Sequence, residues 1–522
     1  MIAAPVAPGR DRGDAPWWLV ALCLISALLT FAGLQTAARI FAGVFEYPLD
    51  DVYIHLAMAE EITRGHYGVN PGEAVGASSS VIYPLLLLPF SGTDVQWMLP
   101  FLWNLAALAL AAWLFGLAIA EAAGRGALSP AVAAVIAVAA PFGLNMHGVA
   151  FTGMENMLHG AAALAVLLGL WRFLNDGLLR GWFVATVIVS PLLRYEGLAL
   201  SLLAVALIGL AGRWRAAAAL GLAILVPLAL FSAFLVWLGL DALPGSVIAK
   251  MTLGDPGLTG VARILRNLSL NLGKPQGLYL AALVALTLVL ATARRGAARR
   301  LLAVAGLAGA AHLIVAQLGW MHRYEHYILF TLVAALLLTM RQGLPGGIAL
   351  AGVGLAVIAG GPAYQVDFYR EYAWNPAAIH LQHAQMARFV HSELKAPVAV
   401  NDLGWVAWRN DDFVYDLWGL GSREALIARA GGAAADGWAG PLLARRGIHV
   451  AMVYEKHFGA ALGPGWAKVA DLVMDPPVGR LGDWRVSFYA DSPAEAAMLL
   501  GKLRRFAPTL PVGSIMAFSG RY

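Results

Sequence analysis

The densest set of ionisable residues in an otherwise apolar chain lies between residues 46 and 80, EYPLDDVYIHLAMAEEITRGHYGVNPGEAVGASSS. Two adjacent aspartates, Asp50 and Asp51, stand near its start. Neighbouring carboxylates repel, so the pKa of one is raised unless a cation lies between them, and such a carboxylate is suited to act as a general base. A structural role is the alternative, because acids placed before VYIHLAMAEEI also satisfy the free amides of a helix N-terminus. One pair of residues can serve both roles.

The composition places this polar segment in an integral membrane protein. Of the 522 residues, 60% are hydrophobic and 13% are charged, against about 45–50% apolar and about 25% charged in soluble domains. The arginines lie largely between apolar runs, which predicts cytoplasmic loops and makes a nucleic-acid-binding patch unnecessary. The single cysteine, Cys23, excludes an intrachain disulfide and a cysteine-based metal site.

Apolar runs long enough to cross about 30 Å of hydrocarbon recur along the first two thirds of the chain. The first run is longer than the core of a signal peptide and has no small-residue cleavage site, so we expect it to be a retained helix. The runs lie near residues 17–38, 97–121, 129–147, 153–172, 216–239, 277–293, 300–319, 324–340 and 344–361.

Two further apolar segments do not fit a single straight crossing. Residues 181–211 are too long for one, so we expect them to rise, break near Pro191 and return, with Arg194 and Glu196 at the apex. Residues 81–90 are too short to span and predict a re-entrant or tilted segment. Counted in this way, about eleven transmembrane helices leave the N-terminus inside and the C-terminal region outside.

Residues 362–522 have ordinary polarity and predict a small α/β domain. The β-rich runs PVAVND, FVYDLW, HVAMVY and RVSFYA alternate there with helix-like stretches such as AAIHLQHAQMARFVHSEL. The expected organisation is a transmembrane module over residues 1–361, with outer loops at about 39–96 and 240–276, followed by an extracytoplasmic domain over residues 362–522.

The predicted topology brings unusual polar residues from four or five loops to the outer side of the membrane. Ionisable groups near membrane depth cost about 2.5–3.5 kcal/mol each, so they usually face a cavity and mark function. Simpler explanations stay open for single residues: an ion pair for Arg194 with Glu196, helix capping for any one serine, and snorkelling to the interface for Lys250. Beyond the two aspartates, the candidates are His55, Ser79, Ser80, Glu155, Arg194, Glu196, Lys250, His322, Arg323 and Tyr324.

These segments resemble, in order, the motifs of bacterial C-type (GT-C fold) glycosyltransferases, particularly the terminal arabinofuranosyltransferase and mannosyltransferase-like group. DDVYIHLAMAEEITRGHYGVNPGEAVGASSSVIYPLLL resembles the first-loop signature of the family, and PFGLNMHGVAFTGMENMLHGAAAL its next apex. LLRYEGLAL resembles its Arg-x-Glu-Gly step, LPGSVIAKM its outer-loop Ala-Lys motif, HRYEHYILF its Arg-Tyr apex, and VAVNDLGWVAWRNDDFVYDLWGLG the opening of its extracytoplasmic domain. The chain departs from the family at Tyr195, where the family often has proline. It also departs after the serines, where the family has a proline sooner than Pro84.

The resemblance implies an enzyme of the bacterial inner membrane whose active site and C-terminal domain face the outer, periplasmic side. It would transfer a hexosyl or pentosyl group, with inversion, from a polyprenyl-phosphate donor to a cell-envelope glycan, lipid or protein. The departures at Tyr195 and Pro84 leave the sugar and the acceptor open. The lipid bilayer is the remaining implied partner, and nucleic acid is not one.

The resemblance also implies roles for the candidate residues. Asp50 or Asp51 would be the general base, with Glu155 beside it, and the cations Arg194, Arg323 and Lys250 would hold the donor phosphate, because planar guanidinium groups match phosphate. If a divalent ion such as Mg²⁺ or Mn²⁺ takes part, its oxygen ligands would be Asp50, Asp51 and Glu155. The implied substrate-binding residues are His55, Glu196, Ser79, Ser80, His322 and Tyr324.

Two other classes of protein fit parts of the pattern. A carrier or flippase-like protein for a lipid-linked sugar would use the acids and arginines as a binding site, but it needs polar groups on both sides of the bilayer. A non-catalytic glycan-binding membrane protein would not need the first-loop acids. It therefore predicts that Asp50→Asn and Asp51→Asn are silent.

Overall fold

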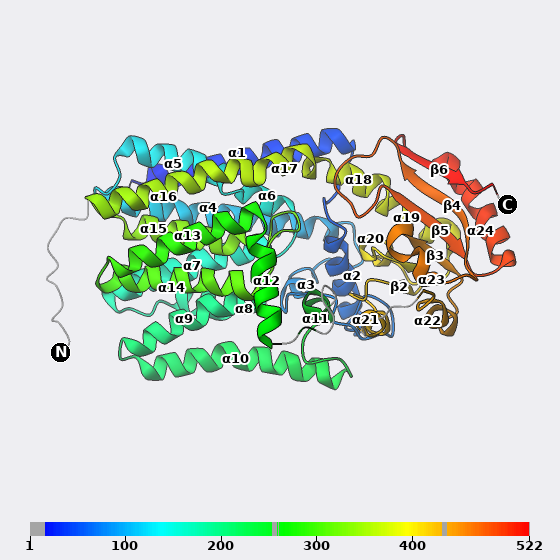
Figure 1. The fold of residues 1–522 in the computed structure, drawn as a ribbon, viewed down its shortest axis with the longest axis horizontal. Helices are drawn as coiled ribbons and strands as arrows, with labels where there is room; N and C mark the ends of the chain where they lie inside the picture. The colour runs from blue at the N-terminus through cyan, green and yellow to red at the C-terminus, as the bar shows by residue number, and fades with distance from the viewer. Residues whose placement is uncertain (1–15, 253–257, 259, 431–435, 521–522) are drawn as a thin grey trace.

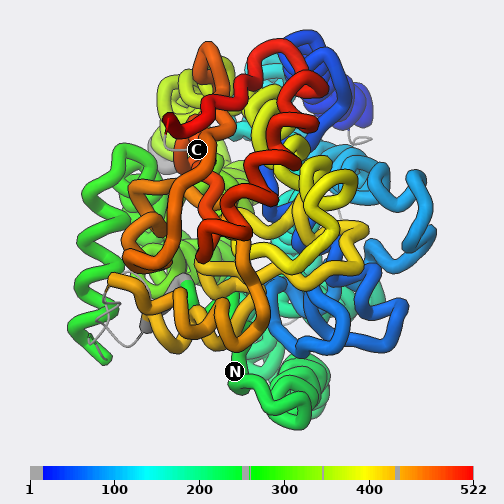
Figure 2. The backbone as a smooth tube through the Cα atoms, turned by 90° about the vertical axis from the view of Figure 1, so that its right-hand side faces the viewer, coloured from blue at the N-terminus to red at the C-terminus, as the bar shows by residue number. Residues whose placement is uncertain are grey.

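The computed structural model describes residues 16–252, 258, 260–430 and 436–520. Long helices run side by side along one part of the molecule, and a β-sheet with its own helices lies beyond one end of them (Figure 1). Seen from that end, the C-terminal part of the chain covers the ends of the bundle helices (Figure 2).

Eight helical segments among the described residues are long and apolar enough to cross a membrane, by length and composition. Three shorter apolar helices, α8, α9 and α15, accompany them. The chain is therefore a polytopic helical membrane protein. The bundle helices are α1 (Trp17–Ala42), α4 (Leu99–Gly124), α5 (Pro130–Gly143), α6 (Met146–Phe151), α7 (Asn156–Asp176), α8 (Gly181–Leu193), α9 (Gly197–Leu210), α10 (Trp214–Trp237), α13 (Pro275–Thr292), α14 (Gly296–Val315), α15 (His326–Thr339) and α16 (Leu344–Gly360).

Helices α7 and α15 form the centre of the bundle. Every residue of α15 is buried, most residues of α7 are buried, and the two helices pack against each other. A helix that is apolar all round is stable when other helices or lipid surround it. Helices α1 and α10 instead expose large apolar side chains such as Leu29, Leu222 and Leu230, as expected for surfaces that face lipid.

The expected break in residues 181–211 is confirmed. Helix α8 ends at Leu193 and α9 begins at Gly197, so the apex contains Arg194, Tyr195 and Glu196. The two helices pack against each other as a hairpin. Residues 81–90 contain the four-residue helix α3 (Tyr83–Leu86) and turns, so this segment does not form a crossing helix.

Shorter helices lie between the bundle and the C-terminal domain. Helices α2 (Asp51–Thr63), α11 (Gly245–Thr252) and α12 (Gly260–Leu272) belong to the predicted outer loops. In Figure 1, α2 and α12 run across the direction of the bundle helices. Helix α2 packs on α20 (Gly404–Ala407) of the C-terminal domain. The first outer loop therefore joins the two parts of the molecule.

The C-terminal domain is built on a six-stranded mixed sheet with the order β2-β1-β3-β5-β4-β6. Strand β1 pairs in parallel with β2 and β3, and the remaining pairs are antiparallel. The strands are β1 (Val398–Val400), β2 (Val414–Asp416), β3 (Val450–Val453), β4 (Ala467–Met474), β5 (Arg485–Ala490) and β6 (Ser514–Phe518). The helices of this part are α17 (Val366–Arg370), α18 (Asn375–Leu381), α19 (His383–Phe389), α20, α21 (Arg423–Ala430), α22 (Gly440–Arg445), α23 (Ala460–Leu462) and α24 (Pro493–Phe506).

The four β-rich runs singled out in the sequence form β1, β2, β3 and β5, whereas β4 and β6 were not predicted. The helix-like stretch before β1 is also interrupted. Gln382 separates α18 from α19, and its side chain donates to the Asp483 carbonyl (3.0 Å) and accepts from the Tyr454 hydroxyl (2.7 Å). These contacts with the sheet domain place His383 at the start of α19.

Candidate functional site

A polar cluster is built where three helices begin. Asp51 is the first residue of α2, Glu155 immediately precedes α7, and Glu196 immediately precedes α9. The unpaired amides and the dipole of a helix N-terminus stabilise nearby carboxylates. Folding these segments as helices therefore presents three acids at one site.

Arg323 reaches the cluster from an unusual turn before α15. Trp320, Met321 and His322 all have positive φ values, 48°, 53° and 50°. Consecutive non-glycine residues in this region are strained and are stable only where the surrounding structure holds them. The turn directs the Arg323 side chain, which is 2% exposed, to the Asp51 carboxylate, where Nη2 donates to Oδ2 at 2.5 Å.

Tyr324 lies between the two arginines of the cluster. The guanidinium carbon of Arg194 is 5.0 Å from the centre of the Tyr324 ring, and that of Arg323 is 5.1 Å from it. Cation–π attraction keeps both cations beside one aromatic ring. The apex between α8 and α9 and the turn before α15 are thereby brought together, as the sequence predicted.

Arg194 is enclosed by two carboxylates. Nη1 donates to Glu155 at 2.6 Å, and Nη2 donates to Glu196 at 2.7 Å. His55 Nε2 lies 3.7 Å from Glu155, and the Ser79 hydroxyl donates to the same carboxylate at 3.4 Å. Buried charges need such partners, because breaking a buried pair costs about 3–5 kcal/mol. Arg194 therefore pairs with two acids and holds them in position.

Ser80 has the capping role that the sequence left open. Its hydroxyl accepts a hydrogen bond from the Tyr83 amide at 3.1 Å and donates to the Leu192 carbonyl at 3.4 Å. The Val81 amide donates to the same carbonyl at 3.0 Å. The serine segment thus fastens the first outer loop to the end of α8, just before Arg194.

Asp50 turns away from Asp51 and toward the C-terminal domain. Its carboxylate accepts hydrogen bonds from the backbone amides of Gly404 (2.6 Å) and Trp405 (2.8 Å). Burial raises the pKa of Asp50 to about 6, with the amides and His383 opposing the rise and Asp402 adding to it. Repulsion between the two adjacent aspartates, the cause predicted from the sequence, is wrong, because the two carboxylates face different regions.

Asp50 belongs instead to a group that the sequence analysis did not identify. Its carboxylate, His383 and Asp402 place ligand-type atoms within 4.8 Å of one another. His383 lies at the start of α19 and Asp402 in the loop after β1, so 333 and 352 residues separate them from Asp50, the differences 383 − 50 and 402 − 50. No short-range spacing in the chain could have connected them.

Two expectations from the sequence need correction, and a third concerns a side chain outside the described residues. Asp50, Asp51 and Glu155 do not form a ligand set, since in the described part of the chain Asp50, His383 and Asp402 are the only such group. His322 pairs with Asp367 of α17 at 2.8 Å and not with an acid of the polar cluster. The side chain of Lys250 lies outside the described residues.

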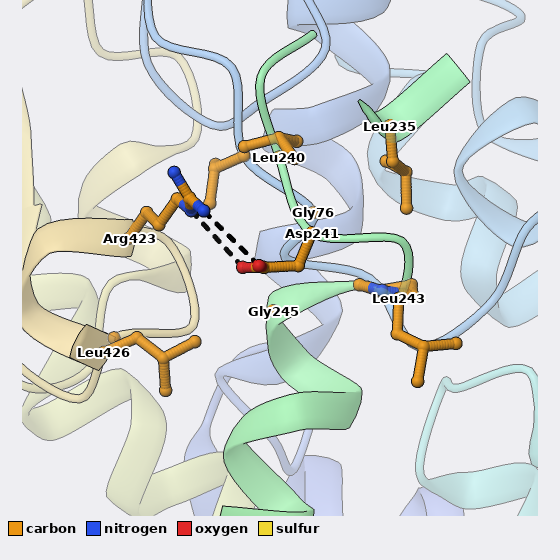
Figure 3. Close-up of a pocket in the computed structure, with 11 residues that line it drawn as sticks. Gly76, Leu235, Leu240, Asp241, Leu243, Gly245, Arg423 and Leu426 are labelled. Atoms are coloured by element: carbon orange, nitrogen blue, oxygen red, sulfur yellow. Dashed lines mark hydrogen bonds and ion pairs between the residues drawn. The ribbon is translucent and has the colours of Figure 1, made fainter. Parts of the chain in front are cut away.

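A small pocket lies where the end of α10, the first outer loop and the C-terminal domain meet (Figure 3). Leucines line much of it, and Asp241 pairs with Arg423 across it at 3.3 Å. None of its lining residues belongs to the polar cluster. The pocket therefore marks a contact among three segments and not the candidate site.

Comparison with known proteins matches the C-terminal part of the chain to a domain family. Residues 370–489 match the model of a domain family described as a domain of unknown function, DUF8728. No curated protein and no solved structure matches the chain. The matched region contains β1, β2, β3, β4 and part of β5, together with His383 and Asp402.

Proposed function

We propose that this protein is a membrane glycosyltransferase of the GT-C type, with about eleven transmembrane helices. It transfers a sugar from a polyprenyl-phosphate donor to a cell-envelope glycan, lipid or protein on the outer face of the bacterial inner membrane. The observation that carries this proposal is the pairing of a partly exposed carboxylate, Asp51, with a buried arginine, Arg323. Beside this pair, Arg194 holds Glu155 and Glu196, an arrangement we call the Arg194 clamp. One base and one phosphate-binding cation are the groups this transfer needs.

Asp51 is the better candidate for the general base. Its side chain is 31% exposed, so an acceptor hydroxyl can approach it, whereas Asp50 is buried and has both oxygens bonded to backbone amides. In the reaction, Asp51 takes the hydroxyl proton while the acceptor oxygen forms a bond to the anomeric carbon. The bond from that carbon to the phosphate oxygen breaks, and the polyprenyl phosphate leaves with the electron pair.

Arg323 is the better candidate for binding the leaving phosphate. Its Nη2 is used by Asp51 and the Tyr324 hydroxyl, but Nε and Nη1 are buried with no hydrogen-bond partner among the described residues. Buried donors without partners are costly, and phosphate oxygens would satisfy both. Arg194 has its two terminal nitrogens committed to carboxylates, so it serves as a positioning residue.

Helix N-termini also add positive charge at the cluster, where three carboxylates face two arginines. Three helices direct their N-termini toward it, and partial positive charge at these ends favours phosphate. His55, Ser79 and Tyr324 adjoin these charged groups and can contact the sugar or the acceptor. The proposed substrate class rests on the resemblance to GT-C enzymes, and the sugar that is transferred is to be identified by assay.

The test is transfer of radiolabelled sugar by the full-length protein in detergent, from a panel of polyprenyl-phosphate donors to isolated envelope lipids and glycans. Asp51→Asn is expected to lower turnover by about 10²- to 10⁴-fold, with donor binding retained. Arg323→Lys is expected to weaken donor binding, because lysine cannot reproduce the planar contact.

The matched control is Asp176→Asn. Asp176 is 35% exposed and pairs with Arg180 at 2.6 Å, so it resembles Asp51 in exposure and pairing but lies at the other end of α7. Its variant should transfer sugar at the wild-type rate. Donor binding by the wild type without any transfer across the panel would contradict the proposal and favour a carrier of lipid-linked sugar.

A further inference from the structure

Asp50, His383 and Asp402 form a compact group between the first outer loop and the C-terminal domain. His383 Nε2 lies 3.1 Å from Asp402 Oδ2, and the ligand-type atoms of all three residues lie within 4.8 Å of one another. Adjacent ligands around a cation with bonds of about 2.1 Å lie about 3 Å apart. The His383–Asp402 pair therefore has the spacing of two ligands of one cation, and Asp50 lies near enough to be the third.

The surroundings hold these side chains in place. The Gly404 and Trp405 amides fix the Asp50 carboxylate, and Asn401 Nδ2 donates to Asp402 Oδ2 at 2.9 Å. Asn401 is itself fixed, because its oxygen accepts from the Tyr454 amide at 2.6 Å. Partners of this kind orient the ligands of protein metal sites and tune their affinity.

The imidazole of His383 is only partly satisfied. Its side chain is 2% exposed, and Nδ1 is buried with no hydrogen-bond partner among the described residues. Nε2 is the nitrogen that faces Asp402, so an ion among the three residues would be bound through Nε2, and Nδ1 is left for a water molecule. Two carboxylates facing one buried imidazole supply the charge that a divalent ion requires.

We propose that Asp50, His383 and Asp402 bind a divalent transition-metal ion of the Mn²⁺ or Zn²⁺ class. An imidazole beside carboxylates suits these ions, whereas Mg²⁺ and Ca²⁺ prefer ligand sets made of oxygen alone. The ion links the segment before α2 to α19 and the loop after β1. It thereby fixes the C-terminal domain on the first outer loop, and this role does not depend on the proposed transfer reaction.

The competing explanation is an ion pair in which a protonated His383 neutralises the two acids without metal. The two explanations differ in stoichiometry. Metal is removed from the full-length protein in detergent with a chelator, and the protein is desalted and incubated with Mn²⁺ or Zn²⁺. Bound metal is then measured by inductively coupled plasma mass spectrometry. The proposal predicts about one ion per chain, a raised thermal midpoint, and for Mn²⁺ a changed electron paramagnetic resonance spectrum.

Asp402→Asn and His383→Gln are expected to remove the bound ion and the rise in thermal midpoint. Asp402 is 28% exposed, so its variant is the safer one for folding and carries the test if His383→Gln does not fold. His449→Gln is the matched control, because His449 pairs with Asp491 at 2.7 Å outside this three-residue group. Metal-free wild type after incubation, or equal binding by wild type and Asp402→Asn, would overturn the proposal.

Discussion

The carboxylates of Asp50 and Asp51 belong to neighbouring residues and enter different regions of the molecule. Asp51 meets Arg323 at the polar cluster, where it is partly exposed. Asp50 is buried and accepts two backbone hydrogen bonds from the C-terminal domain. The start of α2 thus has two separate surroundings. Asp51 belongs to the polar cluster, and Asp50 belongs to the contact with the C-terminal domain, which we call the junction; it contains Asp50, His383, Asp402, Gly404 and Trp405.

The contrast teaches that a pair of acids in sequence need not be a pair in space. Asp50 is the residue before α2 and Asp51 its first residue, and successive residues of a helix point in directions about 100° apart. One turns to α20 and the other to the segment before α15. The contacts of Asp50 are therefore expected to hold the C-terminal domain on the segment before α2 and to leave the chemistry of Asp51 unchanged.

The largest expected effects separate the two aspartates by readout. Asp51→Asn should lower transfer by the folded protein by about 10²- to 10⁴-fold. Its thermal midpoint should also fall, because the buried Arg323 loses its carboxylate partner. Asp50→Asn should lower the thermal midpoint, because asparagine lacks the second acceptor oxygen and leaves one amide unsatisfied at a cost of about 1–3 kcal/mol. Transfer assays and thermal denaturation of the same two preparations check both results, and identical profiles would end the distinction.

Removing the cation of the Arg194 clamp should give the largest loss of stability. Arg194→Met keeps much of the side-chain volume but leaves the buried Glu155 and the partly exposed Glu196 without their cation. The lost partner of Glu155 costs about 3–5 kcal/mol. Thermal denaturation in detergent measures the loss. Adding Glu155→Gln and Glu196→Gln to the variant should restore part of the midpoint, and no restoration would show that the clamp is not held by charge.

The sequence predicted much of the membrane part of this fold. Long apolar runs indicate bundle helices without further information, and the break between α8 and α9 followed from a segment too long for one crossing and containing Pro191. Likewise Arg194, Glu155 and Arg323 could be expected together, because uncompensated charges in an apolar chain need partners. These inferences rest on the cost of burying polar groups, which acts along the whole chain.

The junction could not be predicted in the same way. Asp50 meets His383 and Asp402 only after the sheet domain has folded and docked, and neither residue stands out in a segment of ordinary polarity. The positive φ values before α15 also leave no sequence signal, since Trp320 and Met321 are poor residues for that conformation. Strand β6 lies at the edge of the sheet, where Ile515 and Phe518 are exposed, so its pattern gives little indication of a core strand.

The junction should respond to pH through Glu46. Burial raises the pKa of Glu46 to about 8, with hydrogen bonds from Trp405 and the Tyr47 amide opposing the rise. His383 lowers this pKa, Asp50 raises it, and the Tyr53 hydroxyl also contacts the carboxyl. The folded state therefore keeps a proton that the unfolded state releases above its ordinary value of 4.5.

The stability from protonated Glu46 is fully present below about pH 4.5 and is lost as the pH rises through about 8. The slope reaches at most about 1.4 kcal/mol per pH unit, which gives a few kcal/mol over the window. Glu46→Gln cannot ionise and should show a flatter decline in thermal midpoint between pH 5 and about 8. Parallel curves for the wild type and the variant would assign the pH response to other groups.

The smallest expected effect tests whether the junction and the cluster are independent. A Cβ at Gly404 would lie 2.0 Å from the Asp50 carbonyl oxygen and 2.8 Å from Oδ2, so Gly404→Ala must displace the Asp50 segment. Overpacking of this kind costs about 1–3 kcal/mol. Gly465→Ala is the control in the same domain, because its Cβ would meet no atom within 4 Å. Thermal denaturation should separate the two variants, and transfer by folded Gly404→Ala should stay within a few-fold of wild type. Loss of transfer in that variant would show that the C-terminal domain positions Asp51 directly, and the two regions would then form one site.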